Sequence, residues 1–329
     1  MTRRNGWQVA AATVLLVVAA VAPPVRLPRS SFDYLVTFDI SQSMNVTDVR
    51  LEGRAVSRLQ LARAAMRDAL RRLPCGSKVG WSYFADYRSF TLLLPIEVCS
   101  NYDVLLSALD RIDGRMRWAN ASNVAKGIYW ARRYAGSLAA AVPSTAPTAR
   151  SGTAPGAGPG ADIVFFTDGQ EAPPLPPGQP PMPDLESPLP GGWLIGVGGD
   201  SPSPIPKTDD SGAENGYWTA ETVAQDPSLP PGTSHEHLSE LRESYLQGLA
   251  AQLGLGYRRL DSPSALTRAL LDRRCAHRIG TPTDIRWLPA LDAFVLLTWR
   301  HAPARRRSPT GRSAAHAVGP VEMRYPGAT

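Results

Sequence analysis

FDYLVTFDISQSM, residues 32–44, is the stretch that decides the fold of this 329-residue chain. Its first half, Phe32 to Phe38, is mostly apolar and predicts a buried β-strand. Asp39, Ser41 and Ser43 follow directly, one carboxylate and two hydroxyls at alternating positions. An extended turn with this spacing can direct three oxygen atoms toward one hard cation. The stretch therefore predicts a strand whose carboxyl end carries a divalent-cation site.

Two later stretches carry polar residues at equivalent places. NASNVAKG, residues 120–127, puts Ser122 at the start of a predicted helix, and FFTDGQE, residues 165–171, puts Asp168 directly after a buried strand, with Gly169 permitting a sharp exit. Taken singly, each is also typical of a helix cap or a turn. In a parallel α/β sheet, however, ligands lie at the carboxyl ends of the strands. The three stretches together predict one metal site, made by Asp39, Ser41, Ser43, Ser122 and Asp168.

Strand and helix patterns alternate along the middle of the chain. This predicts the α/β class, a doubly wound and mostly parallel sheet with helices on both faces. We expect one domain over residues 32–275, interrupted by proline-rich insertions at 143–160 and 172–190 and by an irregular excursion at 200–233. The expected strands are 32–38, 78–84, 90–96, 161–167, 193–197 and 257–260, and the expected helices are 55–73, 102–112, 122–138, 236–253 and 262–273.

Two of the three cysteines, Cys75 and Cys99, flank the expected hairpin of strands 78–84 and 90–96. A hairpin in that register brings its ends together, so the pair can close a disulfide, which would suit an oxidising compartment. Two reduced, partly buried thiols are the alternative. Cys275 is left without a role.

Both ends of the chain carry apolar segments beside basic residues. Arg3 and Arg4 precede an apolar run over residues 6–22, which predicts a membrane anchor within residues 1–31, with a cleaved signal peptide as the alternative. In the region 276–329, the segment 285–300 is apolar apart from Arg286 and Asp292, and arginines 305–307 follow it. A second crossing is expected there, with a buried or interfacial helix as the alternative. Positive charge outside both segments predicts cytoplasmic termini and a domain on the periplasmic side of a bacterial inner membrane.

The formal charge of +6 does not indicate nucleic-acid binding. Its basic residues are mostly arginines dispersed along the chain, and no basic stripe is interleaved with aromatic residues. We therefore expect no nucleic-acid partner.

The five predicted site residues resemble the metal-ion-dependent adhesion site of von Willebrand factor A (VWA) domains. The resemblance covers residues 32 to 275, and it departs from the family pattern at Ser122, where threonine is usual. It implies that Ser41 and Ser43 ligate the ion directly, that Ser122 ligates it in the ligand-engaged state, and that Asp39 and Asp168 act through bound waters. It also implies that the ion is Mg²⁺, with Ca²⁺ as the alternative, and that the carboxylate of an acidic partner protein completes the coordination.

The layout of an anchor, a VWA domain and a terminal apolar segment is similar to bacterial Bat-like proteins encoded beside MoxR-type ATPases. The sequence motifs DISQSMNV and FFTDGQE resemble those of the VWA accessory proteins of methanol dehydrogenase maturation. This similarity implies a membrane-anchored interaction module that assists assembly or metal loading of an exported enzyme. It also implies partnership with other VWA proteins or with a MoxR-type ATPase.

Two other classes of function compete with the interaction module. A phosphatase of the haloacid-dehalogenase type also has a strand ending in Asp, but it needs an acidic residue two positions later, where this chain has Ser41. A metal-independent membrane scaffold is the other alternative. His235 and His237 lack a matched ligand spacing and are interpreted as solvated residues. We expect no enzymatic activity.

Overall fold

The computed structural model describes residues 6–141, 160–175, 189–230 and 232–301. The expected insertions at 143–160 and 172–190 lie largely outside these residues. The chain divides into two compact units, residues 27–281 and a second unit that combines residues 1–26 with 282–329.

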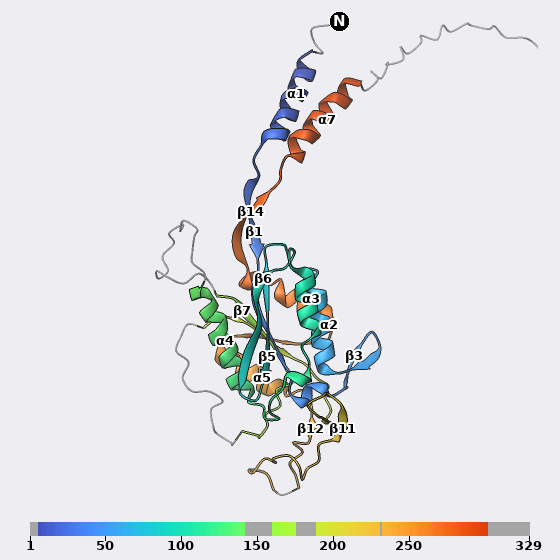
Figure 1. Cartoon of the computed structure of the whole chain (residues 1–329), viewed down its shortest axis with the longest axis vertical. Helices are drawn as coiled ribbons and strands as arrows, with labels where there is room; N and C mark the ends of the chain where they lie inside the picture. Colours follow the sequence, from blue (N-terminus) through green and yellow to red (C-terminus); the bar gives the residue numbers. More distant parts are fainter. Residues whose placement is uncertain (1–5, 142–159, 176–188, 231, 302–329) are drawn as a thin grey trace, which may run out of the picture. The chain divides into compact units, whose positions relative to one another are not determined.

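A six-stranded sheet forms the centre of the larger unit (Figure 1). Its strands run in the order β13 (Gly256–Arg259), β8 (Gly192–Gly196), β7 (Asp162–Thr167), β2 (Asp33–Asp39), β5 (Lys78–Ala85) and β6 (Arg88–Glu97). Every neighbouring pair is parallel except β5 and β6, which form the expected hairpin. The prediction of a mostly parallel α/β sheet is confirmed.

Helices cover both faces of this sheet because successive strand residues point to opposite sides. In β2, Val36 and Phe38 belong to the core shared with α2 (Arg58–Leu70), α3 (Tyr102–Asp110) and α6 (Pro263–Leu270). Leu35 belongs to the opposite core, shared with α4 (Val124–Ala141) and α5 (Glu243–Leu253). A strand buried on both faces explains the nearly continuous apolar sequence of residues 32–38.

Two helix starts differ from the expected ones by three or more residues, for local reasons. Helix α2 begins at Arg58 because Ser57 and Gln60 form a reciprocal capping box, and residues before it pair as β3 (Val49–Leu51) and β4 (Arg54–Val56). Helix α5 begins at Glu243 because residues 238–239 pair as β12 with β9 (Ser203–Pro204).

The excursion at 200–233 was expected to be irregular, and this is wrong for its first half. Besides β9, it contains β10 (Pro206–Thr208) and β11 (Glu214–Tyr217), which pair in antiparallel fashion. Periodicity could not reveal these strands, which are only two to four residues long. The remaining elements are a sheet of β1 (Val25–Ser31) with β14 (His277–Thr283), and 3₁₀ turns at Gln42–Asn45, Gly114–Met116 and Arg273–Cys275.

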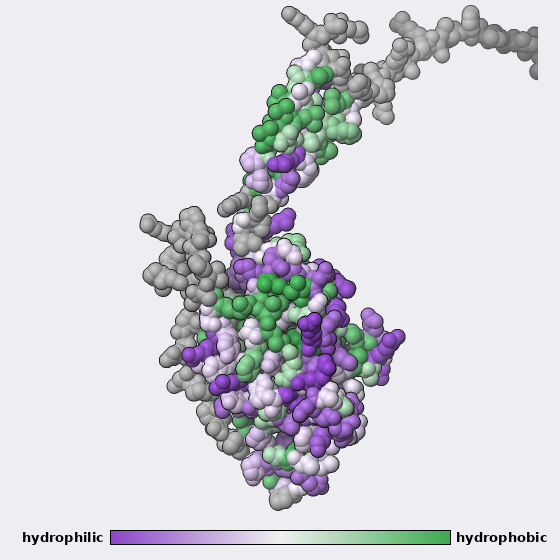
Figure 2. Space-filling view, viewed as in Figure 1, coloured by the Kyte–Doolittle hydropathy of each residue, from purple (hydrophilic) through white to green (hydrophobic). Residues whose placement is uncertain are grey.

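In the smaller unit, α1 (Gly6–Val21) packs against α7 (Trp287–His301). Small residues lie in the contact, since Ala12 and Ala293 are buried, whereas the outer surface is apolar and exposed (Figure 2). Over the residues that are described, no helix has both the length and the apolar content of a membrane span. The crossings expected at 6–22 and 285–300 are therefore not confirmed.

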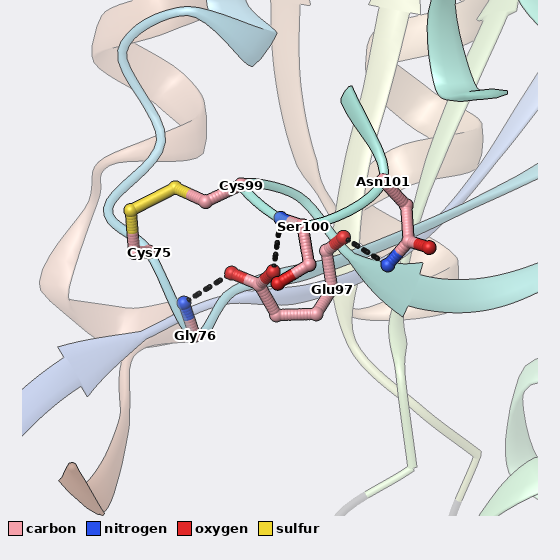
Figure 3. The surroundings of a disulfide bond; sticks show 6 residues. All are labelled: Cys75, Gly76, Glu97, Cys99, Ser100 and Asn101. Carbon is pink, nitrogen blue, oxygen red and sulfur yellow. Dashed lines mark hydrogen bonds between the residues drawn. A yellow bond between two sulfur atoms is a disulfide. The ribbon is translucent and has the colours of Figure 1, made fainter. Parts of the chain in front are cut away.

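A disulfide between Cys75 and Cys99 joins the two ends of the β5–β6 hairpin (Figure 3). Beneath it, the Glu97 carboxylate accepts hydrogen bonds from the backbone N–H groups of Gly76 (2.7 Å) and Ser100 (2.6 Å). Desolvation acts to raise the pKa of Glu97, but these donors outweigh it and hold the pKa at about 2. The two ends of the hairpin are therefore held together at the same point by the disulfide and by the hydrogen bonds of Glu97.

We expect the disulfide to stabilise the larger unit by about 2–4 kcal/mol, since it closes a loop of 24 residues in the unfolded chain. Replacing both residues, Cys75→Ser with Cys99→Ser, should lower the free energy of unfolding by that amount in urea titrations. Dithiothreitol should destabilise the natural chain and leave the double variant unchanged. Equal sensitivity of the two proteins to the reductant would contradict this expectation.

Candidate metal site

The loop after β2 holds its three polar side chains through short contacts. One Asp39 carboxylate oxygen accepts a hydrogen bond from the backbone N–H of Ser41 at 2.8 Å, which curls the chain into the 3₁₀ turn at 42–45. The hydroxyls of Ser41 and Ser43 are then 3.1 Å apart. The alternating positions of Ser41 and Ser43 thus bring their hydroxyl oxygens next to each other, and the Asp39 carboxylate is bonded to the backbone of the same loop.

Asp39 is fully buried, and both of its carboxylate oxygens are engaged. The second oxygen accepts a hydrogen bond from the Thr167 hydroxyl at 2.7 Å, which ties the end of β2 to the end of β7. Burial and the nearby Asp168 carboxylate raise the pKa of Asp39 to about 7. Among the described residues no Lys or Arg forms an ion pair with it. A cation bound in this loop would balance the negative charge of the ionised Asp39 carboxylate.

Asp168, by contrast, has a cationic partner inside the protein. Arg58 donates from one terminal nitrogen to Asp168 at 2.6 Å and from the other to Asp48 at 2.5 Å, and the Arg58 side chain is wholly buried. Ser239 adds a hydrogen bond of 3.2 Å to the same Asp168 oxygen. Burial acts to lower the pKa of Arg58, but the two carboxylates outweigh it and raise the pKa. Arg58 therefore offsets the charge of Asp168 and fixes its orientation.

Ser122 contributes a hydroxyl with no hydrogen-bond partner. Its backbone pairs with Ala172, through N–H···O distances of 2.7 and 2.8 Å, and its Oγ is buried. Ser122 lines the same cavity of about 270 Å³ as Ser41 and Ser43. A buried hydroxyl left without a partner costs free energy unless something else meets it. Three serines from two loops therefore line one cavity.

Glu171 forms the wall of this cavity beside α4. Its carboxylate accepts hydrogen bonds from the backbone N–H of Val124, at the start of α4, and from the Tyr245 hydroxyl at 2.6 Å. Burial raises the pKa of Glu171 to about 7 in spite of these donors.

The structure brings the five residues named from the sequence into one region. Asp39 accepts a hydrogen bond from Ser41 and lies close enough to Asp168 for that carboxylate to raise its pKa, while Ser41, Ser43 and Ser122 line the cavity. Sequence reasoning missed the partners that fix them: Thr167, Arg58, Asp48 and Glu171. Asp48 pairs with Arg58 and was not singled out from the sequence. The capped helix start at Ser57 is the one signal that places Arg58 near the candidate metal loop, residues 39–45.

This set of donors fits a hard divalent cation. All are oxygens, which Mg²⁺ and Ca²⁺ prefer, and one hydroxyl is unpartnered. Asp39 does not line the cavity, and both of its carboxylate oxygens accept hydrogen bonds within the protein. The other candidate cluster in the described residues, Cys75 with Glu97 and Cys99, has its sulfurs in the disulfide and does not suit a metal. His235 and His237 stack edge to face rather than forming a ligand set.

Comparison with known proteins agrees with this fold. The family model for the von Willebrand factor type A domain matches residues 35–170. UPF0353 proteins of Mycobacterium sp. (strain KMS) and Mycolicibacterium paratuberculosis are each 28% identical to this chain, over 54% and 52% of it. Those alignments cover 49% and 44% of the relatives, so the chain spans about half the length of the curated relatives that it matches.

Among solved structures, an aerotolerance-related membrane protein from Bacteroides fragilis is 19% identical, with a TM-score of 0.47 and coverage of 73% of this chain and 96% of that one. BatB from Bacteroides thetaiotaomicron is 21% identical, with a TM-score of 0.46 and coverage of 73% and 97%. The family match and the observed sheet together give the larger unit the α/β fold of a VWA domain.

Replacing Arg58 should strongly lower the free energy of unfolding of the domain. Arg58→Met leaves Asp168 and Asp48 buried without a cation, and breaking a buried ion pair on one side costs about 3–5 kcal/mol. Urea titration should show this loss for Arg58→Met and a change below about 1 kcal/mol for the exposed control Arg54→Met. Similar stabilities for the two variants would contradict the stabilising role of the Arg58 ion pairs.

Glu171 should make the metal-free protein less stable as pH rises. Its folded-state pKa, about 7, lies above the ordinary value of 4.5, so the folded state retains a proton that the unfolded chain releases. The stabilisation is therefore complete below pH 4.5 and is lost as pH rises through 7, by about 3 kcal/mol at most. Urea titrations in EDTA at pH 5 and pH 8 should show a smaller pH dependence for Glu171→Gln than for the natural chain. An unchanged dependence would contradict this assignment.

Proposed function

We propose that this chain, with its VWA fold, is a membrane-associated interaction module that captures the carboxylate of an acidic partner protein through a divalent cation. Mg²⁺ is the expected ion and Ca²⁺ the alternative. The observation that carries the proposal is the buried, unpartnered hydroxyl of Ser122, a residue that lines the same cavity as Ser41 and Ser43.

The charge balance of the site favours binding over catalysis. Two carboxylates, Asp39 and Asp168, lie beside the loop after β2, and Arg58 forms an ion pair with Asp168. The cavity is also lined by Glu171 and Glu236, whose carboxylates accept hydrogen bonds from other groups of the protein. A dication held by three hydroxyls and Asp39 would keep a net positive charge. Hard cations take six or more oxygen ligands, so positions would remain for an external ligand. An anionic oxygen from a partner supplies both the missing charge and a missing ligand.

The smaller unit supports association with a membrane. Helices α1 and α7 bury small residues against each other and expose large apolar side chains, including Val21, Phe294 and Trp299 (Figure 2). Exposed apolar surface of this extent marks an interaction with lipid or protein. We propose a bacterial inner-membrane location with the larger unit in the periplasm, where the disulfide suits the compartment.

The partner system that we propose is the assembly or metal loading of an exported enzyme, of the methanol dehydrogenase type. Other VWA proteins or a MoxR-type ATPase would be further partners. This part of the proposal rests on the resemblance of DISQSMNV and FFTDGQE to the accessory proteins of that system.

Ser122→Ala and Asp39→Ala separate folding from metal-dependent capture. Ser122→Ala removes a hydroxyl that has no partner, so its free energy of unfolding should change by less than about 1 kcal/mol, while Mg²⁺ affinity in calorimetry and partner recovery from membranes should fall about tenfold or more. Asp39→Ala should abolish both. EDTA should release the partner from the natural chain, and the exposed control Asp103→Ala should behave like the natural chain.

The alternatives give different results in the same experiments. Partner binding that survives EDTA and Asp39→Ala would support a metal-independent scaffold and defeat the proposal. Hydrolysis of a phosphate monoester that depends on Asp39 and Mg²⁺ would support the phosphatase.

A further inference from the structure

Part of the excursion at 200–233 forms a wall over the metal loop. Trp218, which directly follows β11, lines the cavity together with Ile205 and Val223. On the other side the cavity is bounded by Pro173 and Pro174. The three hydroxyls therefore lie in a hollow with apolar sides rather than on a flat surface.

Gln42 connects this wall to the metal loop through hydrogen bonds. It lies between Ser41 and Ser43, and its side-chain oxygen accepts hydrogen bonds from the indole N–H of Trp218 at 2.9 Å and the backbone N–H of Thr208 at 3.0 Å. Its amide nitrogen donates to Asn120 at 2.7 Å, in the loop that carries Ser122. One side chain thus connects both metal-site loops with the indole.

The polar groups of the cavity are mostly engaged within the protein. Glu236 accepts hydrogen bonds from Arg242 and Gln170, each at 2.8 Å, and Glu171 is held by Val124 and Tyr245. Gln42 has its oxygen and nitrogen engaged as described. The lining thus combines the three serines, polar side chains that are mostly engaged in hydrogen bonds within the protein, and apolar side chains that include Ile205, Trp218 and Val223.

We propose that Trp218 determines the specificity of the site, which accepts a narrow partner segment presenting a carboxylate next to an apolar side chain. The carboxylate reaches the metal while the apolar neighbour packs on the indole. This inference rests on the proposed function, because it requires a metal that accepts a carboxylate.

The size of the hollow supports a narrow ligand. About 270 Å³ is slightly below the roughly 300–1,000 Å³ of typical small-molecule pockets. It can accommodate one or two protruding side chains, whereas the wall keeps a broad acidic surface away from the hydroxyls. Burial of an aliphatic side chain contributes enough free energy to distinguish ligands that share the same carboxylate.

Two amidated peptides test the inference, acetyl-Gly-Gly-Asp-Leu-Gly-Gly and the same peptide with Ser in place of Leu. Calorimetry on the full chain in Mg²⁺ should show about tenfold tighter binding of the Leu peptide. Trp218→Ala should remove that preference and retain Mg²⁺ affinity, and Trp218→Phe, which keeps an aromatic surface, should retain much of it. The matched control is Tyr217→Ala, since Tyr217 is exposed on β11 and does not line this cavity.

Each outcome bears on one proposal or on both. Equal binding of the two peptides, or an unchanged preference in Trp218→Ala, would overturn the role of Trp218 and leave metal-dependent capture intact. Failure of both peptides to bind in Mg²⁺ would overturn both proposals. A loss of preference in Tyr217→Ala equal to that in Trp218→Ala would show a general disturbance of the excursion and would also overturn the specific role of Trp218.

Discussion

The ion pairs of Arg58 are the interaction on which the rest of this site depends. The guanidinium is wholly buried at the first residue of α2, and it joins Asp48, Asp168 and Ser239, which come from three distant parts of the chain. Asp48 also accepts the backbone N–H of Gly199 at 2.9 Å, at the start of the excursion. Burying a charge is costly unless it is paired and hydrogen-bonded, so these segments are stable only in an arrangement that brings all the partners together.

This arrangement also sets the electrostatics of the metal loop. Of the two buried carboxylates beside the loop, Asp168 is committed to Arg58, while Asp39 has only hydrogen-bond donors around it. The protein thus provides one uncompensated carboxylate and a group of hydroxyls. Such a site would hold a dication without neutralising it, and that property distinguishes a site for capturing anionic groups from a closed structural site. This asymmetry follows from the fold, because Arg58, at the start of α2, pairs with Asp168 and not with Asp39.

The parts of this structure that sequence could predict are those governed by periodicity and by strand ends. The apolar strand at 32–38 and the polar residues after it depend on local order in the chain, and parallel strands bring their carboxyl ends to one edge. Arg58 could not be assigned in this way. It lies in an arginine-rich helix with Arg63 and Arg67, and only its position directly after the capping residue Ser57 distinguishes it from those two. Only the fold buries Arg58 and leaves Arg67 partly exposed, paired with Asp110.

The excursion at 200–233 illustrates a second limit of sequence reasoning. Its strands are short and its sequence is rich in turn residues, so its order comes from contacts with the rest of the domain rather than from local propensity. Gln42 supplies those contacts from inside the metal loop, through two hydrogen bonds to Thr208 and Trp218. Gln42 lies between Ser41 and Ser43, and its side chain could have faced solvent. Instead it is buried and accepts hydrogen bonds from Thr208 and Trp218. The loop that carries the two serines and the wall of the cavity are therefore held together by one side chain.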